Sequence, residues 1–329
     1  MDVLLRRTLI AAALVAIAGC SGGASPQSAP LPSQNALTFV HRGVPFALPM
    51  LHSAVRSTTG GYPTKKSLVF EGDQAEAAVN IYQTADLPSN PAPIATIHVA
   101  NGCPYGMAMN KKGTLYVADN CFTGDVEEYP KGSTTLQTTI TDGISYPLGL
   151  AIDKQGTLYV SNYPAAITEY PKGSTSPSKT ITGGGMADPF GLALDKKGNL
   201  YIADFGASAV FELPAGGSSV TNLNLQSVGE PLGLAIDQKT GTLWETAGSS
   251  ANVINIYQLG GSSSPIMTIP GNGEPYAISL ENKGKPKAEV VESDLGTYEV
   301  YAYMPGSYTP YATLSNGISL PTGLLIARP

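Results

Sequence analysis

The chain has 329 residues, with 25 Asp and Glu against 19 Lys and Arg, and a formal net charge of −6. It contains no basic run, and because contacts with nucleic-acid phosphates need clustered Lys and Arg, the composition excludes nucleic acid as a partner. Gly and Pro are abundant, at 37 and 26 residues, which is typical of many short strands joined by tight turns.

Residues 1–20 have the form of an export signal. Arg6 and Arg7 precede an apolar segment, residues 9–18, that is too short to span a bilayer. The segment ends in Ile17-Ala18-Gly19-Cys20, which resembles the lipobox of bacterial lipoproteins. That resemblance implies acylation of Cys20 and a membrane anchor at the cell envelope, in the outer membrane if the organism is diderm. The alternatives are an ordinary signal peptide with an incidental cysteine and a twin-arginine signal.

Residues 21–63 form the next segment, which we expect to lie outside the folded domain. Its first part, 21–36, is rich in Ser, Gly and Pro and has the composition of a flexible tether. Residues 37–62 contain apolar side chains, but Pro45, Pro49 and Pro63 discourage regular structure. This second part stays unassigned, and the folded domain is expected to span residues 64–329.

One short pattern starts six times in the remaining chain, at intervals of 42 to 46 residues. A repeat of this length with strand-like content indicates a propeller or a solenoid. The six anchors are Pro104-Tyr105-Gly106, Pro147-Leu148-Gly149, Pro189-Phe190-Gly191, Pro231-Leu232-Gly233, Pro275-Tyr276-Ala277 and Pro321-Thr322-Gly323.

Each repeat reads as four antiparallel strands. In the third repeat these are 191–195, 200–204, 210–213 and 220–223, with a Gly-containing turn after the first strand. The last anchor has only residues 323–327 behind it, so the N-terminal strands 68–72, 79–82 and 94–97 must complete its blade. We therefore predict an all-β, six-bladed propeller closed by a composite blade from both chain ends.

The repeats at 147–162 and 189–204 resemble those of NHL-repeat propellers, whose pattern is Pro-x-Gly-x-Ala-x-Asp-x-x-Gly-x-Leu-Tyr-Val-x-Asp. The resemblance covers residues 64–329 and implies the fold. It leaves function open, because related propellers include lactonases and other hydrolases, lyases and binding modules.

The central residue of each anchor bears on the hypothesis that the protein is a lactonase. In propellers of the gluconolactonase and senescence-marker type, Asn or Asp at this position in certain blades binds the catalytic metal. Here the six residues are Tyr105, Leu148, Phe190, Leu232, Tyr276 and Thr322. Because a hard cation needs oxygen ligands, we expect no metal in this ring. Two interpretations remain: these side chains pack under the loops, or they line a shallow pocket for an apolar or sugar-like ligand.

Two glutamates break the strand pattern. Glu245 and Glu292 stand where the other blades are expected to have Val117, Val160, Ile202 and Phe70. A buried carboxylate is costly and its pKa tends to rise, which makes the pair the available acid–base candidates. The alternative is sequence drift in an irregular part of the chain.

Acidic residues at strand ends have a simpler interpretation. Asp119, Asn162, Asp204 and Asp294 end second strands, with Gly72 and Ala247 at the matching places, and we expect them to cap loop N–H groups. The alternative is a metal ring made by these three carboxylates and one amide around one face. Asp153, Asp195 and Asp237 precede hairpin turns, where Asp bonds the turn backbone.

Cys103 and Cys121 remain after Cys20 is assigned to the lipid. Both lie on loops expected at one face of the ring, and an exported chain folds in an oxidising compartment, so we expect a disulfide worth about 3 kcal/mol. The three His residues, at 41, 52 and 98, match no metal-ligand spacing with the cysteines.

The sequence thus favours a lipid-anchored envelope propeller that works as a binding or assembly module, without a cofactor. Its expected partners are the membrane, through the lipid on Cys20, and an envelope protein, a glycan or a small apolar ligand. The rivals are a lactonase-like hydrolase with a rearranged site and a structural surface protein.

Overall fold

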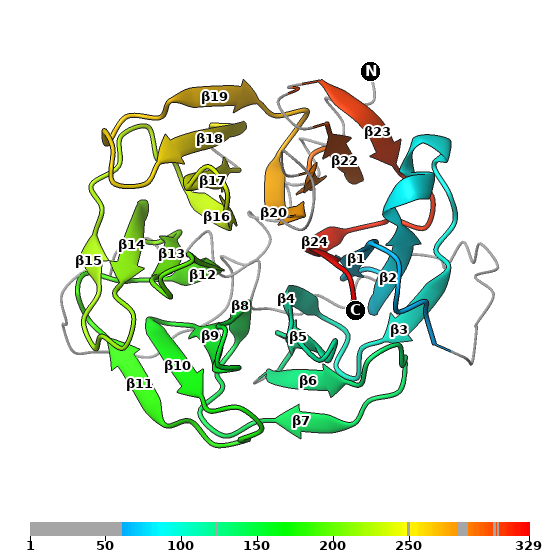
Figure 1. Cartoon of the computed structure of the whole chain (residues 1–329), viewed down its shortest axis with the longest axis horizontal. Helices are drawn as coiled ribbons and strands as arrows, with labels where there is room; N and C mark the ends of the chain where they lie inside the picture. The colour runs from blue at the N-terminus through cyan, green and yellow to red at the C-terminus, as the bar shows by residue number, and fades with distance from the viewer. Residues whose placement is uncertain (1–60, 123, 249–250, 282–288, 305–306, 308) are drawn as a thin grey trace, which may run out of the picture. The chain divides into compact units, whose positions relative to one another are not determined.

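The computed structural model describes residues 61–122, 124–248, 251–281, 289–304, 307 and 309–329. These residues form six four-stranded antiparallel sheets arranged as blades around a centre (Figure 1). The chain is therefore a six-bladed β-propeller. Cys20 and the segment 21–60 lie outside the described residues.

Every blade has the same strand order, from the inner strand at the centre to the outer strand at the rim (Figure 1). Blade 1 is composite and consists of β24 (Pro321–Ala327), β1 (Leu68–Asp73), β2 (Ala78–Gln83) and β3 (Ala95–His98). Blade 2 consists of β4 (Pro104–Met109), β5 (Leu115–Asp119), β6 (Asp125–Tyr129) and β7 (Thr138–Ile140). Blade 3 consists of β8 (Pro147–Ile152), β9 (Leu158–Asn162), β10 (Ala166–Tyr170) and β11 (Lys179–Thr182).

The other three blades continue the ring in chain order. Blade 4 consists of β12 (Pro189–Leu194), β13 (Leu200–Asp204), β14 (Ala209–Leu213) and β15 (Thr221–Asn222). Blade 5 consists of β16 (Pro231–Asp237), β17 (Thr242–Ala247), β18 (Val253–Gln258) and β19 (Met267–Pro270). Blade 6 consists of β20 (Pro275–Glu281), β21 (Glu289–Asp294), β22 (Glu299–Tyr303) and β23 (Pro310–Leu314).

The second strand of each blade is almost entirely buried. All five residues of β5, β9 and β13 are buried, on both faces of the strand. A blade packs against a neighbour on each side, so both faces of its sheet are removed from water. The hydrophobic clusters accordingly combine residues of adjacent blades, as where Phe70 of β1 and Val117 of β5 share one cluster.

The glycine of the Pro-x-Gly anchor allows the blades to approach one another closely. A Cβ on Gly233 would lie 2.7 Å from the carbonyl oxygen of Tyr276 in the next blade. A hydroxyl reinforces the same junction, because Thr246 Oγ1 accepts the Gly233 N–H at 2.7 Å and donates to Tyr276 O at 2.6 Å. The glycine therefore permits this close approach in the five anchors that contain it, and the remaining anchor has Ala277.

The composite blade forms as predicted, by antiparallel pairing of β1 with β24. Its register corrects one detail of the sequence alignment. Asp73 lies opposite Pro321, as Asp119 lies opposite Pro104, and Glu71 lies opposite Leu324, as Val117 lies opposite Met107. The residues that match Asp119 and Val117 are thus Asp73 and Glu71, not Gly72 and Phe70. Pairing across the chain ends decides this register, and a local pattern does not contain it.

Packing on the propeller starts before residue 64, where the folded domain was expected to begin. Tyr62 is buried, its ring centroid lies 5.3 Å from that of Phe70, and its N–H donates to Gly132 O at 3.0 Å. The structure also has a short 3₁₀ helix, η1 (Thr84–Ser89), between β2 and β3. No helix among the described residues is long and apolar enough to cross a membrane.

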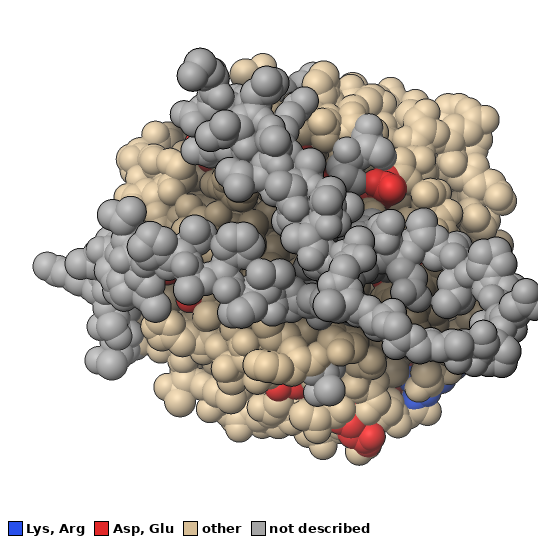
Figure 2. All heavy atoms as spheres, turned by 180° about the vertical axis from the view of Figure 1, so that it is seen from behind, with Lys and Arg blue, Asp and Glu red and all other residues tan. Residues whose placement is uncertain are grey.

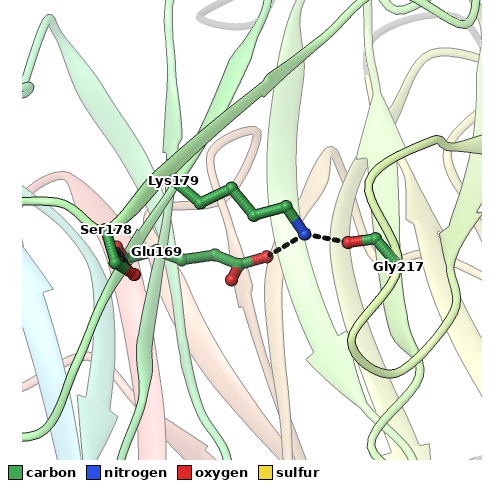
Figure 3. A network of polar contacts seen from close by, with 4 residues as sticks. All are labelled: Glu169, Ser178, Lys179 and Gly217. Carbon is green, nitrogen blue, oxygen red and sulfur yellow. Dashed lines mark hydrogen bonds and ion pairs between the residues drawn. The ribbon is translucent and has the colours of Figure 1, made fainter.

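Polar contacts at the rim add to the apolar packing between blades. Lys179 Nζ of blade 3 lies 3.6 Å from Glu169 Oε1 and donates to Gly217 O of blade 4 (Figure 3). On the side of the molecule opposite to the view of Figure 1, the visible described surface shows acidic side chains at several places and no large basic patch (Figure 2).

Candidate functional site

The inner strands of all six blades enclose a central cavity of about 310 Å³. The cavity extends along these strands from the anchor residues, such as Tyr105, to their far ends, such as Met109. Its lining is apolar except for backbone and a few hydroxyl and amide groups, among them Ser279 and Gln238. This is the concave site that the fold positions for a ligand.

The central residues of the anchors line this cavity in all six blades. Each of them is at most 7% exposed, so the structure both buries these side chains and places them at the channel. The two interpretations of the sequence therefore describe the same residues. The set is Tyr105, Leu148, Phe190, Leu232, Tyr276 and Thr322.

Three aromatic rings meet at the anchor end of the channel. Phe190 and Tyr276 have centroids 5.7 Å apart with nearly perpendicular planes, and Tyr105 lies 6.4 Å from each of them. They come from alternate blades, namely 2, 4 and 6. Burial raises the pKa of both tyrosine hydroxyl groups, so the rings stay neutral. The three rings form an aromatic floor at this end of the cavity.

Thr322, the one anchor residue with an aliphatic hydroxyl, forms hydrogen bonds with the backbone. Its Oγ1 lies 2.6 Å from Pro104 O of blade 2 and 3.2 Å from Gly72 O of blade 1. This is the junction at which the composite blade meets its neighbour. The side chain therefore contributes to closure of the ring more than to recognition of a ligand.

Asp188 is a residue near the floor that the sequence analysis missed. It directly precedes the Pro189 anchor, is 1% exposed, and neither of its carboxylate oxygens has a hydrogen-bond partner among the described residues. Burial and then the charge of Asp204 raise its pKa to about 8, and its charge in turn raises the pKa of Tyr276. Burial thus favours the protonated form of this carboxyl, which lies near Tyr276 but does not line the cavity.

The position before each anchor proline could have drawn attention to Asp188. The fifth repeat has Glu274 at the same place, where burial and then the charges of Asp294 and Glu230 raise its pKa. An alignment of the repeats shows these acids, but only the structure shows how near they lie to Tyr276.

Glu245 and Glu292 are both fully buried, at 0% exposure, and neither lines the cavity. Glu245 accepts a hydrogen bond from Asn255 Nδ2 at 2.9 Å, and burial raises its pKa to about 7. Glu292 accepts one from the Tyr303 hydroxyl at 3.1 Å, and burial with the charge of Asp294 raises its pKa to about 8. The structure places the two carboxylates inside separate blades, away from the channel.

The strand-end acids cap loops. Asp119 accepts the N–H groups of Asn101 and Cys103 at 2.6 and 3.0 Å. Asp204 accepts those of Ala187 and Asp188, each at 2.9 Å. These carboxylates hold the loops that lead into the inner strands. The turn residue Asp153 acts locally, with Oδ1 accepting the N–H of Gly156 at 2.7 Å.

The two remaining cysteines are joined. Cys103 and Cys121 form a disulfide with their Cα atoms 5.2 Å apart. It links the loop before β4 to the loop after β5, beside the Pro104-Tyr105 anchor. The disulfide therefore restrains the segment that carries one of the three floor rings.

One group of carboxylates converges outside the channel. Asp119, Asp125 and Glu127 of blade 2 each offer an oxygen within 4.8 Å of the other two. From the sequence, Asp119 was grouped with the strand-end residues of other blades, Asn162, Asp204 and Asp294, and no metal site was expected. Asp119 was not paired with two acids from the next strand, because only the β5–β6 register brings them together.

No family model and no curated protein sequence matches the chain. Solved structures do match. A chain of the nidogen/laminin complex has a TM-score of 0.63 at 18% identity, covering 79% of this chain and 98% of that one. A protein of unknown function from Bacteroides caccae has a TM-score of 0.62 at 13% identity, covering 80% and 100%.

Virginiamycin B lyase from Staphylococcus aureus has a TM-score of 0.56 at 14% identity, covering 75% of this chain and 81% of that one. At these identities the similarity shows the fold alone. The chain belongs structurally with β-propellers, and its function has to be argued from its own residues.

Proposed function

We propose that this chain is a lipid-anchored, cell-envelope propeller of NHL type that binds a small apolar ligand in its central channel. The observation that carries the proposal is the cavity of about 310 Å³ with its floor of Tyr105, Phe190 and Tyr276. Small-ligand sites are concave and mostly apolar, with a few convergent polar groups. The polar groups that line the cavity, among them Ser279 and Gln238, are the ones available to orient such a ligand.

The cavity lining favours binding over catalysis. Among the described residues that line it, none is Asp, Glu, His, Cys, Lys or Arg. General acid–base and nucleophilic catalysis use such groups within hydrogen-bond reach of the substrate. We therefore expect no metal-dependent lactone hydrolysis by the purified protein. Robust turnover that a chelator abolishes would overturn this proposal in favour of a lactonase-like hydrolase.

Among the similar structures, one comes from a protein–protein complex and another is a lyase. The propeller architecture is therefore compatible with protein binding and with lyase activity, but at such low sequence identity neither function can be assigned to this chain. An envelope protein or a glycan remains an alternative occupant of the loops around the channel.

A neutral fluorescent probe, N-phenyl-1-naphthylamine, tests the channel directly. We expect saturable binding with enhanced fluorescence, weakened roughly threefold to tenfold by Tyr105→Ala or Phe190→Ala, since an aromatic contact is worth about 0.5–1.5 kcal/mol. Asp153→Ala and Asp195→Ala, at hairpin turns far along the inner strands, serve as controls and should leave the affinity unchanged. Equal effects of all four substitutions would contradict a site at the floor.

The anchor is tested separately. Cys20→Ala removes the thiol that the lipobox resemblance assigns to acylation, so the variant should be released from the membrane fraction. Unaltered fractionation would refute the anchor and would leave the channel proposal intact.

A further inference from the structure

Blade 2 contains a buried acidic cluster that the described residues of the other blades do not repeat. Asp119 ends β5, and Asp125 and Glu127 lie on β6, where Asp119 pairs with Asp125 and Val117 with Glu127. Asp119 and Glu127 are 0% exposed and Asp125 is 9% exposed. None of the three forms an ion pair with a described basic residue. Three acids thus share one buried place without a compensating positive charge.

The hydrogen bonds around the cluster leave one oxygen without a partner. Asp119 accepts the N–H groups of Asn101 and Cys103, and Glu127 accepts the Ala100 N–H and the Tyr129 hydroxyl. Asp125 Oδ2 accepts Asn101 Nδ2 at 3.0 Å. Asp125 Oδ1, although buried, has no partner at all. An unsatisfied buried oxygen is costly, and this one is free to bind a ligand.

The spacing of the oxygens suits a calcium ion. Calcium binds oxygen ligands at about 2.3–2.6 Å, so two ligands of one ion lie no more than about 5 Å apart. One oxygen from each of the three side chains meets this limit. The set contains no sulfur or imidazole ligand, which favours a hard cation over zinc or copper. Each carboxylate oxygen that already accepts one N–H keeps a lone pair for a metal.

From this geometry we infer that Asp119, Asp125 and Glu127 form a structural calcium site in blade 2. The ion is held between β5, β6 and the loop before β4, whose Asn101 and Cys103 N–H groups bond Asp119. It acts beside the Cys103–Cys121 disulfide, as a second cross-link of the same loops. The site is separate from the channel and does not depend on what the channel binds.

The other blades provide an internal control. The positions of Asp125 and Glu127 are taken by Ala209 and Phe211 in blade 4, and by Glu299 and Tyr301 in blade 6. Blade 6 therefore has a pair of acids, Asp294 and Glu299, without the third. Glu299→Gln removes a carboxylate at the matching position without affecting the proposed site.

Terbium luminescence tests the inference, with the full-length protein stripped of metal by chelator and then dialysed. Terbium replaces calcium at oxygen sites and is sensitised by a nearby tyrosine, here Tyr129, whose hydroxyl bonds Glu127. We expect a saturable signal that calcium displaces, and one calcium per chain by titration calorimetry, with a dissociation constant of about 1 mM or tighter. Asp125→Asn should weaken binding about tenfold or more.

Glu299→Gln should leave the affinity unchanged, and Tyr129→Phe should dim the luminescence while calcium still binds by calorimetry. Circular dichroism in chelator checks that each variant folds. Absence of calcium binding to the folded wild-type chain would overturn the inference, whether or not Asp125→Asn folds. Terbium binding that Asp125→Asn does not weaken would overturn it as well.

Discussion

Two halves of the ring have different kinds of residue at the middle of the second strand, apolar in three blades and acidic in the other three. In blades 2, 3 and 4, which we call the apolar arc, the middle of the second strand is Val117, Val160 or Ile202. In blades 5, 6 and 1, the acidic arc, the same position is Glu245, Glu292 or Glu71. All six side chains are 0% exposed. The backbone is the same, so the difference lies in how each side chain is accommodated.

A local hydrogen-bond donor accompanies each buried glutamate. Asn80 donates to Glu71 at 3.2 Å, Asn255 to Glu245 at 2.9 Å and Tyr303 to Glu292 at 3.1 Å. One oxygen of each glutamate nevertheless has no partner, and burial raises the pKa of all three. Burial therefore favours the protonated form of all three glutamates, and each keeps one hydrogen-bond donor at a strand position that is apolar in the other arc.

The largest effect should come from opening the ring within the acidic arc. Deletion of residues 321–329 removes β24, which buries Leu324 and Ile326 and pairs along β1. Because each buried side chain of this size is worth about 1.5–3 kcal/mol and β1 would become an exposed edge, we expect loss of more than about 5 kcal/mol. Urea denaturation measures this loss of free energy of unfolding, with deletion of residues 328–329 alone as the control. An unchanged melting temperature would show that closure does not stabilise the fold.

The pH dependence of stability should distinguish the arcs next. Glu245 and Glu292 have pKa values of about 7 and 8 in the fold, against 4.5 for an ordinary glutamate. Between these limits the folded chain binds more protons than the unfolded chain, so the free energy of unfolding falls as pH rises from about 4.5 to 8.

Glu292→Gln removes this dependence at one site and keeps an oxygen that accepts from Tyr303. It should be more stable than wild type at pH 8 by on the order of 2–4 kcal/mol, with the advantage vanishing near pH 4. Exposed Asp142, changed to Asn, is the control. If Glu292→Gln stabilised the protein equally at all pH values, Glu292 would not be a buried acid that titrates in this range.

Replacing the buried Glu–Asn pair of blade 5 by the Val–Thr pair of blade 3 should change the free energy of unfolding less. Blade 3 pairs Val160 with Thr168 where blade 5 pairs Glu245 with Asn255. Asn255→Thr alone removes the donor from a buried acid and should cost about 1–3 kcal/mol. The double change Glu245→Val/Asn255→Thr should recover at least about 1 kcal/mol of that loss, and a double-mutant cycle measures the coupling. Strict additivity would mean that the two side chains do not act as a pair.

The smallest effect is expected at the rim of the apolar arc. Lys179→Ala removes the contacts with Glu169 and Gly217, which are partly exposed (Figure 3). Exposed ion pairs typically contribute about 0.2–1 kcal/mol, so the change in chemical denaturation should stay within that range and shrink at high salt. If Lys179→Ala lowered the free energy of unfolding as much as Asn255→Thr, contacts at the rim would stabilise the blades more than we expect.

Much of the fold could be read from local repetition. The anchors at Pro104 and Pro147 and the strands that follow them recur in each repeat, because every blade has to pack on identical neighbours. Pairing of the two chain ends followed from counting strands. The register of that pairing did not, because a shift of one residue exchanges Glu71 with Phe70 while the local pattern stays similar.

The sequence by itself determined the blade, the number of blades and the six side chains at the channel, since all of these depend on periodicity along the chain. Only the tertiary structure decided which side chains converge across strands. It closed the floor from Tyr105, Phe190 and Tyr276, placed Asp188 beside it, and gathered Asp119, Asp125 and Glu127 in one blade. The three rings occupy alternate anchors of the repeat, but only the approach of the inner strands at the centre brings them into contact, and only the pairing of β5 with β6 brings the three acids together.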